Sequence, residues 1–221
     1  MFGSRVVCIG GLPGIGSVGK VAADYLATAL ECSTIKPFFS SGFPAQVVIS
    51  QGLAELLHAE LKAPKEKKDL FILCGDAQPI DIAGMYSLAG EILESAKAEG
   101  VTDMITLAAY VGDTRDKVLG ATSEASLAQE LEKNGFPLLK SGAIGGLNGL
   151  LAGLAPLYGM RGFCLLATTS GAEPVDIDAA TILLKAINSL LGLNLEISII
   201  EPGMEEIDEV SSPEEIDMNY R

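Results

Sequence analysis

The sequence predicts an α/β fold, a three-layer sandwich in which a mainly parallel central sheet lies between helices. Short apolar runs typical of buried strands alternate along the chain with longer segments of helical periodicity. Of the 221 residues, 48% are hydrophobic and 20% are charged, so the chain has enough apolar surface to bury and is not expected to be disordered. The 25 glycines follow no three-residue period, which excludes collagen and indicates tight loops.

The first quarter of the chain predicts a strand, a helix and two further strands. Residues 5–9 form a mostly apolar run that is typical of a buried strand. A glycine-rich turn leads from it into a helix over residues 17–30. Strands are expected at residues 35–40 and 46–50, because a Gly-Phe-Pro turn separates these two runs. The run 53–61 fits either a helix or one arm of a β-hairpin.

The middle of the chain continues the alternation. Residues 63–68 carry four charged side chains and are expected to form a solvated turn. The uninterrupted apolar run 70–74 lies between Asp69 and Gly75, which is typical of a strand that is covered on both faces. A helix over residues 86–98 and a strand over residues 104–109 follow.

The C-terminal half of the domain predicts three helices and one strand. The helices are expected over residues 126–133, 147–158 and 178–191, and the strand over residues 163–167. No internal repeat or linker interrupts this order, so one α/β domain is expected over residues 1–200.

Residues 201–221 differ in composition from the rest. They contain eight acidic residues and one arginine, a formal charge of −7 out of −14 for the chain. Such a segment buries too little apolar surface to offset the entropy lost on ordering, so we expect a flexible, disordered acidic tail. By itself it is either a solubilising appendage or a tether.

Composition also excludes several function classes. A net charge of −14 argues against nucleic-acid binding, which needs clustered Lys and Arg. The segment 141–160 is uncharged and resembles a membrane span, but six of its residues are glycine and its apolar helix is about 18 Å long, too short to cross a bilayer. No signal peptide is recognised at the start. A cytoplasmic protein without nucleic-acid or membrane partners is therefore expected.

The sequence shows no metal or cofactor signature. The cysteines form no CxxC pair, and the single His58 completes no zinc site with them. Buried, reduced thiols are favoured over a redox or catalytic cysteine. The four cysteines are Cys8, Cys32, Cys74 and Cys164. Neither catalytic residues nor cofactors are assigned.

A glycine motif after the first strand is the main candidate for ligand binding. Gly14, Gly16 and Gly19 fit the GxGxxG pattern, whose backbone N–H groups can hold a phosphate at a helix start. The expected acidic partner at the end of the next strand is missing, however. With Lys20 the same segment imitates a P-loop, but Val21 replaces the magnesium-binding Ser or Thr. A structural turn is therefore favoured, with Gly14 needed for a positive φ or a close backbone approach.

Two further groups of polar residues follow predicted strands. Asp76 and Gln78 come after the strand 70–74, at the carboxyl edge where open α/β sheets place ligands. The other group, Asp113, Arg115 and Asp116, follows the next strand. No paired-carboxylate or nucleophile–histidine arrangement assembles from them. If the protein is an enzyme, its ligand edge is expected to consist of Gly14, Gly16, Gly19, Asp76 and Gln78.

Four segments together resemble the proteasome assembly chaperone family of archaea and eukaryotes. They are Gly-Leu-Pro-Gly-Ile-Gly-Ser-Val-Gly at 11–19 with Ala-Ala-Asp-Tyr-Leu at 22–26, Gly-Asp-Ala-Gln-Pro at 75–79, Asn-Gly-Leu-Leu-Ala-Gly-Leu-Ala at 148–155, and Asp-Ala-Ala at 178–180. The resemblance implies a three-layer fold reminiscent of purine nucleoside phosphorylases, with no known catalysis. The names of some relatives imply an ATP-grasp ligase, so an ATP-grasp-like or nucleoside-phosphorylase-like enzyme using the Gly14–Gly19 loop is the alternative.

The resemblance also implies a partner. Members that act on proteasomes typically end in hydrophobic–Tyr–any residue, and this tail inserts between adjacent proteasome α-subunits. Here the last residues are Asn219, Tyr220 and Arg221, so tyrosine is in place and asparagine departs from the pattern. We expect an assembly chaperone that binds proteasome α-subunits or a related ring through these residues. A homo-oligomer is also expected, because the apolar content predicts faces that a monomer would leave exposed to water.

Overall fold

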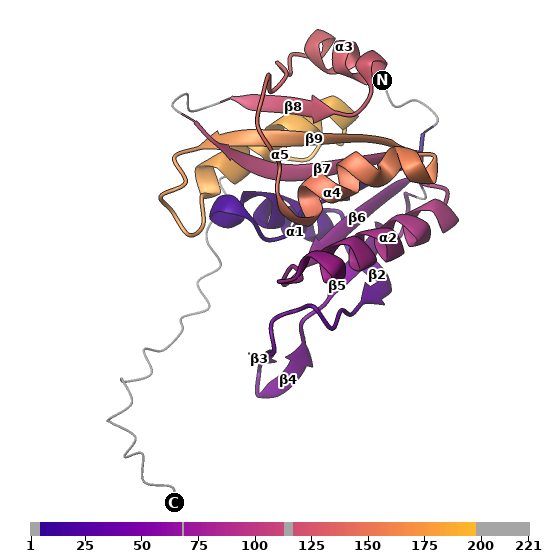
Figure 1. The fold of residues 1–221 in the computed structure, drawn as a ribbon, viewed down its shortest axis with the longest axis vertical. Helices are drawn as coiled ribbons and strands as arrows, with labels where there is room; N and C mark the ends of the chain where they lie inside the picture. Colours follow the sequence, from indigo (N-terminus) through magenta and orange to yellow (C-terminus); the bar gives the residue numbers. More distant parts are fainter. Residues whose placement is uncertain (1–4, 68, 113–116, 198–221) are drawn as a thin grey trace, which may run out of the picture.

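The computed structural model describes residues 5–67, 69–112 and 117–197, which form a central sheet covered by helices (Figure 1). The strands are β1 (Val7–Gly10), β2 (Cys32–Phe38), β3 (Val47–Ser50), β4 (Leu53–Leu56), β5 (Ala59–Pro64), β6 (Leu70–Gly75), β7 (Asp103–Val111), β8 (Val118–Thr122) and β9 (Arg161–Thr169). The α-helices are α1 (Val18–Ala29), α2 (Ile82–Ala98), α3 (Ala125–Lys133), α4 (Gly146–Leu154) and α5 (Ile177–Leu191). Short 3-10 turns, η1 (Ile15–Ser17) and η2 (Ala155–Tyr158), precede α1 and follow α4.

Seven strands form the central sheet in the order β2-β5-β6-β1-β7-β9-β8. The four middle strands, from β6 to β9, run parallel to one another. The outer strands β2, β5 and β8 join the sheet through antiparallel pairs. The sheet is therefore mixed, and the mainly parallel character that the sequence predicted holds for its four middle strands. The neighbours β2, β5 and β6 are antiparallel because no helical crossover separates β2 from β5 or β5 from β6, and parallel neighbours require such a crossover.

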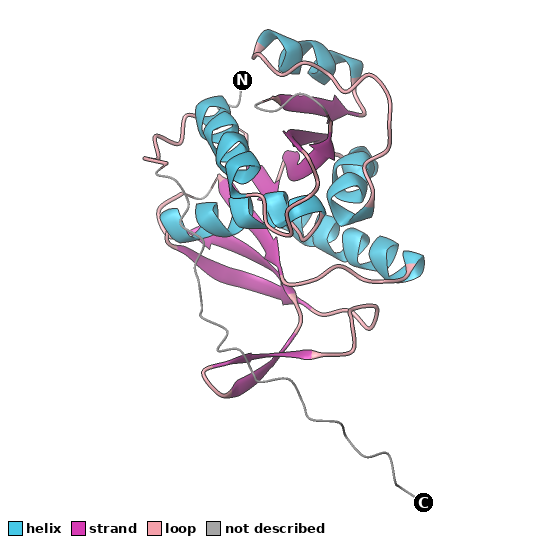
Figure 2. Cartoon of the chain, turned by 90° about the vertical axis from the view of Figure 1, so that its left-hand side faces the viewer, coloured by secondary structure: helices cyan, strands magenta, loops and turns pink. Residues whose placement is uncertain are grey.

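Helices cover both faces of the sheet, as the predicted three-layer arrangement requires (Figures 1 and 2). Alternate side chains of β1 point to opposite faces, so Val7 and Ile9 pack with α1 and α5, while Cys8 packs with α2 and α4. Both sides of the parallel strands are buried, which explains their uninterrupted apolar sequences. The predicted α/β fold is confirmed.

Several elements differ from their predicted bounds. The ambiguous run 53–61 is extended and forms β4 and the start of β5 rather than a helix. Residues 63–64, predicted in a turn, complete β5, and β8 had no counterpart in the prediction. Helix α2 begins at Ile82, earlier than predicted, because the Asp81 carboxylate accepts a hydrogen bond from the Gly84 N–H at 2.7 Å and caps the helix.

The strands β3 and β4 form a separate two-stranded sheet that projects from the body (Figures 1 and 2). The sequence predicted residues 46–50 as a strand but did not place it outside the main sheet. A two-residue turn joins the strands, and both of its residues, Gln51 and Gly52, have positive φ angles of 49° and 81°. Such turns match the natural twist of a hairpin.

Candidate functional site

Close packing requires two glycines at the junction of β1 and α1, Gly11 in the loop and Gly19 in the first turn of α1. A Cβ atom on Gly11 would lie 2.0 Å from the Gly19 carbonyl oxygen, and one on Gly19 would lie 2.1 Å from the Leu107 carbonyl oxygen. These contacts bring α1 directly against β1 and β7, which a larger side chain would prevent. Close helix–strand packing thus accounts for Gly19, the last glycine of the GxGxxG pattern.

Gly14 and Gly16 have different environments. Gly16 has a φ of 56° and its carbonyl oxygen accepts a hydrogen bond from the Asp176 N–H at 2.8 Å. Gly14 has an extended φ of −167°, and an added Cβ would meet nothing closer than 3.8 Å. The expectation that Gly14 itself needs a positive φ or a close approach is therefore wrong. In this loop the left-handed positions are Gly16 and Ser17.

The start of α1 is poorly suited to a phosphate. The Cβ of Asp176 lies 3.1 Å from where a Gly16 Cβ would be, so a carboxylate-bearing side chain is adjacent to the loop. The Lys20 ammonium group, which a P-loop would direct at a nucleotide, lies 2.8 Å from the Asp24 carboxylate one turn along α1. The Asp176 carboxylate is directed at the start of α5, where it accepts a hydrogen bond from the Ala179 N–H at 2.9 Å, and its side chain occupies the space beside the loop. The ion pair with Asp24 leaves Lys20 engaged along α1.

Two amide side chains join the loops at the carboxyl edge of the parallel strands. Asn148, at the start of α4, accepts a hydrogen bond from the Leu12 N–H and donates one to the Leu12 carbonyl oxygen, both at 3.0 Å. Gln78 donates to the Pro13 carbonyl oxygen and accepts from the Leu147 N–H at 2.6 Å. Together they join the loops after β1 and β6 to α4. Their hydrogen-bonding atoms are therefore engaged with the protein's own backbone.

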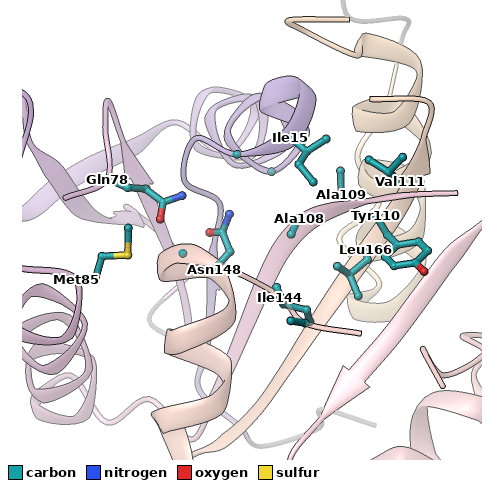
Figure 3. Close-up of a pocket in the computed structure, with 15 residues that line it drawn as sticks. Ile15, Gln78, Met85, Ala108, Ala109, Tyr110, Val111, Ile144, Asn148 and Leu166 are labelled. Carbon is teal, nitrogen blue, oxygen red and sulfur yellow. The ribbon is translucent and has the colours of Figure 1, made fainter. Parts of the chain in front are cut away.

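A cleft of about 610 Å³ opens beside these amides (Figure 3). Figure 3 shows Gln78 and Asn148 on one side and Ile15, Tyr110 and Leu166 on the other. None of the described residues that line it is charged. The lining residues are Gly14, Ile15, Gly19, Gln78, Met85, Ala108, Ala109, Tyr110, Val111, Ala143, Ile144, Gly145, Gly146, Asn148 and Leu166. The cleft thus suits an apolar or neutral group rather than a polyphosphate.

The structure brings together three of the five residues that the sequence proposed as a ligand edge. Gly14, Gly19 and Gln78 line the cleft, whereas Gly16 and Asp76 do not. The Asp76 carboxylate instead lies 3.2 Å from both the His58 backbone nitrogen and its ring Nδ1. Asp76 thus contacts the residue before β5 instead of the cleft. The candidates Asp113, Arg115 and Asp116 lie outside the described residues.

The wall formed by residues 143–146 was not anticipated by the sequence reasoning. This segment reaches the cleft from a loop before α4, about 65 residues after Gln78 in the chain. The glycine at 146 was the available signal: it has a φ of 73°, and an added Cβ would lie 2.5 Å from the Gln78 side-chain oxygen, whereas Gly145 has no close neighbour. The pairing of this loop with Gln78 depends on tertiary contacts.

A buried carboxylate lies at the opposite edge of the sheet. Asp103 at the start of β7 is fully buried and accepts hydrogen bonds from Arg161 at the start of β9 and from Thr102. Burial raises the pKa of the Asp103 carboxyl, although Thr102 and Arg5 act to lower it. Arg161 also contacts Glu130 of α3 at 2.9 Å. This network joins strand starts to a helix and is distant from the cleft, so we assign it a structural role.

The cysteines match the expectation of buried thiols. Cys8, Cys74 and Cys164 are buried, Cys32 is half-buried, and none forms a disulfide. Burial raises the pKa of Cys8 and Cys164 to about 12 and that of Cys32 to about 11. Thiols with such raised pKa values are poor nucleophiles at neutral pH.

The described residues contain neither a cluster of metal-binding side chains nor a helix that could span a membrane. Within the part of the chain that the structure describes, no three metal-binding side chains come together. Among the same residues, no helix is both long enough and apolar enough to cross a bilayer. The proposed anchor residues Asn219, Tyr220 and Arg221 lie outside the described residues, as does the whole segment 201–221.

Comparisons with known proteins relate this fold to proteasome-associated proteins. The model of the PAC2 family matches residues 8–212. The crystal structure of PbaB from Pyrococcus furiosus, described as an archaeal proteasome activator, is 32% identical, with a TM-score of 0.77 over 87% of this chain and 85% of that chain. PbaA from the same organism, an archaeal homolog of proteasome-assembly chaperone, is 30% identical, with a TM-score of 0.74 over 87% of this chain and 79% of that chain.

A curated sequence gives the same extent of similarity. An uncharacterized protein from Methanocaldococcus jannaschii is 32% identical over 213 residues, which cover 93% of this chain and 82% of that protein. The similarity therefore includes nearly the whole α/β body, and not the glycine motif alone.

Proposed function

Because this chain belongs to the PAC2 family, we propose that it is a non-enzymatic chaperone or activator that binds proteasome α-subunits or a related ring assembly. The observation that carries the proposal is the 32% identity to an archaeal proteasome activator across most of both chains. The uncharged cleft and the occupied amide side chains also favour a protein-binding role over nucleotide chemistry. We place this activity in the cytoplasm and in a homo-oligomer.

The proposed anchor consists of Asn219, Tyr220 and Arg221. In this proposal Tyr220 fills a pocket between neighbouring ring subunits, in the manner implied by the resemblance to tail-inserting chaperones. The described body ends at residue 197, so 22 residues separate it from Tyr220. Fully extended, these residues span at most about 80 Å, which limits how far the anchor reaches. Several tails on one oligomer would raise the effective concentration of each tail at a ring.

The test is capture of purified proteasome α-subunits by the full chain. Deletion of residues 219–221 should weaken capture and leave the melting temperature unchanged. Asn219→Ile should strengthen capture, because it restores an apolar contact worth about 1 kcal/mol, or about fivefold in affinity. Asn219→Gln is the matched control, since it keeps a polar amide at the same position, and should bind like the parent. If the deletion and the isoleucine variant both bind like the parent, the tail is not the anchor. If the parent captures no ring subunit at all, the chaperone proposal fails.

The cleft supports one second candidate function, the binding of a small ligand by an ATP-grasp-like or nucleoside-phosphorylase-like enzyme. Its volume of about 610 Å³ falls in the usual range for ligand pockets. Thermal melting with ATP, NAD or phosphate tests this candidate. A ligand-induced rise in melting temperature that Ile15→Trp abolishes would favour it, because a bulky side chain there would fill the cleft. An unchanged melting temperature with all three ligands would count against it.

A further inference from the structure

Strand β7 extends beyond its neighbour β1 at the carboxyl edge of the sheet. Its register with β1 covers residues 103–106, whereas its register with β9 continues to Val111. The next residue, Leu107, is covered by the first turn of α1, because a Cβ on Gly19 would lie 2.1 Å from the Leu107 carbonyl oxygen. Among the described residues, the last part of β7, residues 108–111, therefore has no neighbouring strand on the side of β1.

Two residues of this last part direct their main-chain groups to the open side. Successive residues of a strand hydrogen-bond to alternate sides. The Asp103 N–H donates toward the side of β1 and the Gly112 N–H toward β9, both at 3.2 Å. The odd-numbered residues Ala109 and Val111 therefore face the side of β1, where no hydrogen bond among the described residues reaches their N–H and C=O groups. We call residues 108–111, with these unpaired groups, the free edge.

The free edge forms one wall of the cleft of about 610 Å³, opposite Gln78 and Asn148 (Figure 3). Ala109 is half-buried and Val111 is 52% exposed, so solvent reaches this edge. An unpaired strand edge is a template for pairing with another chain. The main-chain groups of Ala109 and Val111 are spaced by about 6.6 Å, the repeat of every second residue in a strand. The cleft therefore presents hydrogen-bonding groups with the spacing of an extended peptide.

The two sides of the free edge differ in character. On the side of α4 the cleft is apolar, and Ile144 and Leu166 pack together there. On the other side, at the start of α5, lies a second cavity of about 540 Å³. The charged residues that line it are all acidic, namely Glu173, Asp176 and Asp178. We call this cavity the acidic hollow.

The acidic hollow adjoins the cleft at Ile15 and Val111. A Cβ on Gly171 would lie 2.9 Å from the Val111 side chain and 4.0 Å from that of Ile15. Thr169, which lines the hollow, is also the β9 partner of Val111. Because successive side chains of an extended peptide point to opposite sides, one enters the apolar cleft when the next points toward the hollow. The surface is thus complementary to a peptide in which apolar and basic residues alternate.

We propose that the free edge and the cleft bind an extended peptide segment of a partner protein, in which an apolar residue is flanked by basic residues. The segment takes the place in the sheet that β1 would occupy if it continued, and its main chain pairs with the free edge. Its apolar side chain enters the cleft, and its basic side chains are attracted by the acidic hollow. This surface is separate from the proposed anchor at residues 219–221, so it adds a second contact to the proposed function.

The experiment titrates the full chain with a blocked synthetic peptide, Thr-Arg-Leu-Arg-Thr, and follows hydrogen exchange at single amides. Binding should slow exchange about tenfold or more at the amides of Ala109 and Val111, which gain partners. The amides of Ala108 and Tyr110 are the internal control, because they already face β9, and should change less than about twofold.

Methylation of the peptide's own amides tests the main-chain pairing. The amide of its Leu and that of its second Arg lie on opposite edges of the extended peptide, and only one edge faces β7. N-methylation at one of these positions should therefore weaken binding about tenfold or more, and at the other less than about threefold. A peptide with Asn in place of Leu, which is similar in size but polar, should bind about tenfold more weakly.

The charge preference is tested by exchanging charges on both partners. Glu173→Lys should weaken binding of the arginine peptide about fivefold and should strengthen binding of Thr-Glu-Leu-Glu-Thr relative to the parent chain. Glu94→Lys is the matched control, because it makes the same change at an exposed residue of α2, farther along the helix than the cleft residue Met85. It should shift both affinities less than about twofold.

The proposal is overturned if the parent chain does not bind the arginine peptide at millimolar concentration, or if exchange does not slow at Ala109 and Val111. Equal effects of the two N-methylated peptides, or of Glu173→Lys and Glu94→Lys, also overturn it. A small ligand that raises the melting temperature, with no peptide binding, assigns the cleft to that ligand instead. Removal of residues 219–221 should leave peptide binding unchanged. Loss of ring capture with intact peptide binding, or the reverse, therefore distinguishes failure of the proposed function from failure of this surface.

Discussion

Asn148→Ala tests the hydrogen bonds that attach α4 to the loop after β1. The side chain is 4% exposed, and its amide makes paired hydrogen bonds, each of 3.0 Å, with the N–H and the carbonyl oxygen of Leu12. Leu12 itself is fully buried. The two residues are 136 positions apart in the sequence, so this contact links distant parts of the chain.

The magnitude follows from the groups left behind. Alanine leaves one donor and one acceptor of the backbone buried without these partners, and each costs about 1–3 kcal/mol. Because the cavity relaxes in part, we expect a total loss of about 2–4 kcal/mol in the free energy of unfolding. For a protein of this size, each kcal/mol lowers the melting temperature by about 2–4 °C, so a fall of about 5–15 °C is expected.

Urea unfolding and calorimetry, at one fixed protein concentration, measure this loss. Asn134→Ala is the matched control, because its amide donates to the Glu130 carbonyl oxygen at an exposed helix end. That variant should lose about 1 kcal/mol or less. Asn148→Asp should also be strongly destabilised, since it places a carboxylate oxygen against the Leu12 carbonyl oxygen. Equal stability of Asn148→Ala and Asn134→Ala would refute the reasoning, and would show that the paired bonds make no net contribution.

Two other predictions follow from the loop glycines and the thiols. Gly19→Ala should prevent folding or lower the melting temperature severely, because its Cβ would lie 2.1 Å from the Leu107 carbonyl oxygen. Gly14→Ala should be tolerated, because its Cβ would meet nothing closer than 3.8 Å. Equal melting temperatures for the two variants would contradict this prediction. Native protein at pH 8 should react slowly with a thiol reagent, first at half-buried Cys32, because the raised pKa values of Cys32, Cys8 and Cys164 keep the thiolate scarce. All thiols should react at once in denaturant, and mass spectrometry that finds Cys8 labelled before Cys32 would contradict the assigned burial.

Much of the candidate site was identified from the sequence, but not its chemistry. The glycine motif predicted Gly14, Gly19 and the start of α1 at the carboxyl edge of β1, and the polar residues after the strand 70–74 predicted Gln78 at the same edge. The glycine motif resembles a phosphate-binding loop because of its glycine spacing, and the close packing of α1 against the sheet also requires glycine at position 19. The neighbouring Asp176 and the backbone partners of Gln78 belong to distant segments, so the local pattern contained no information about them.

The sequence by itself determined the α/β class, because the periodicity of apolar residues reports which faces of a strand or helix must be buried. It also determined the buried parallel centre, where runs such as residues 70–74 are apolar on both sides. Only the tertiary structure decided which strands became neighbours, and so made β2, β5 and β8 antiparallel. The apolar runs of β3 and β4 are similar in composition to buried strands, yet the structure leaves both exposed. An apolar sequence predicts that a surface is more stable when it is covered. Only the arrangement of the folded chain shows whether another element of the same molecule covers it.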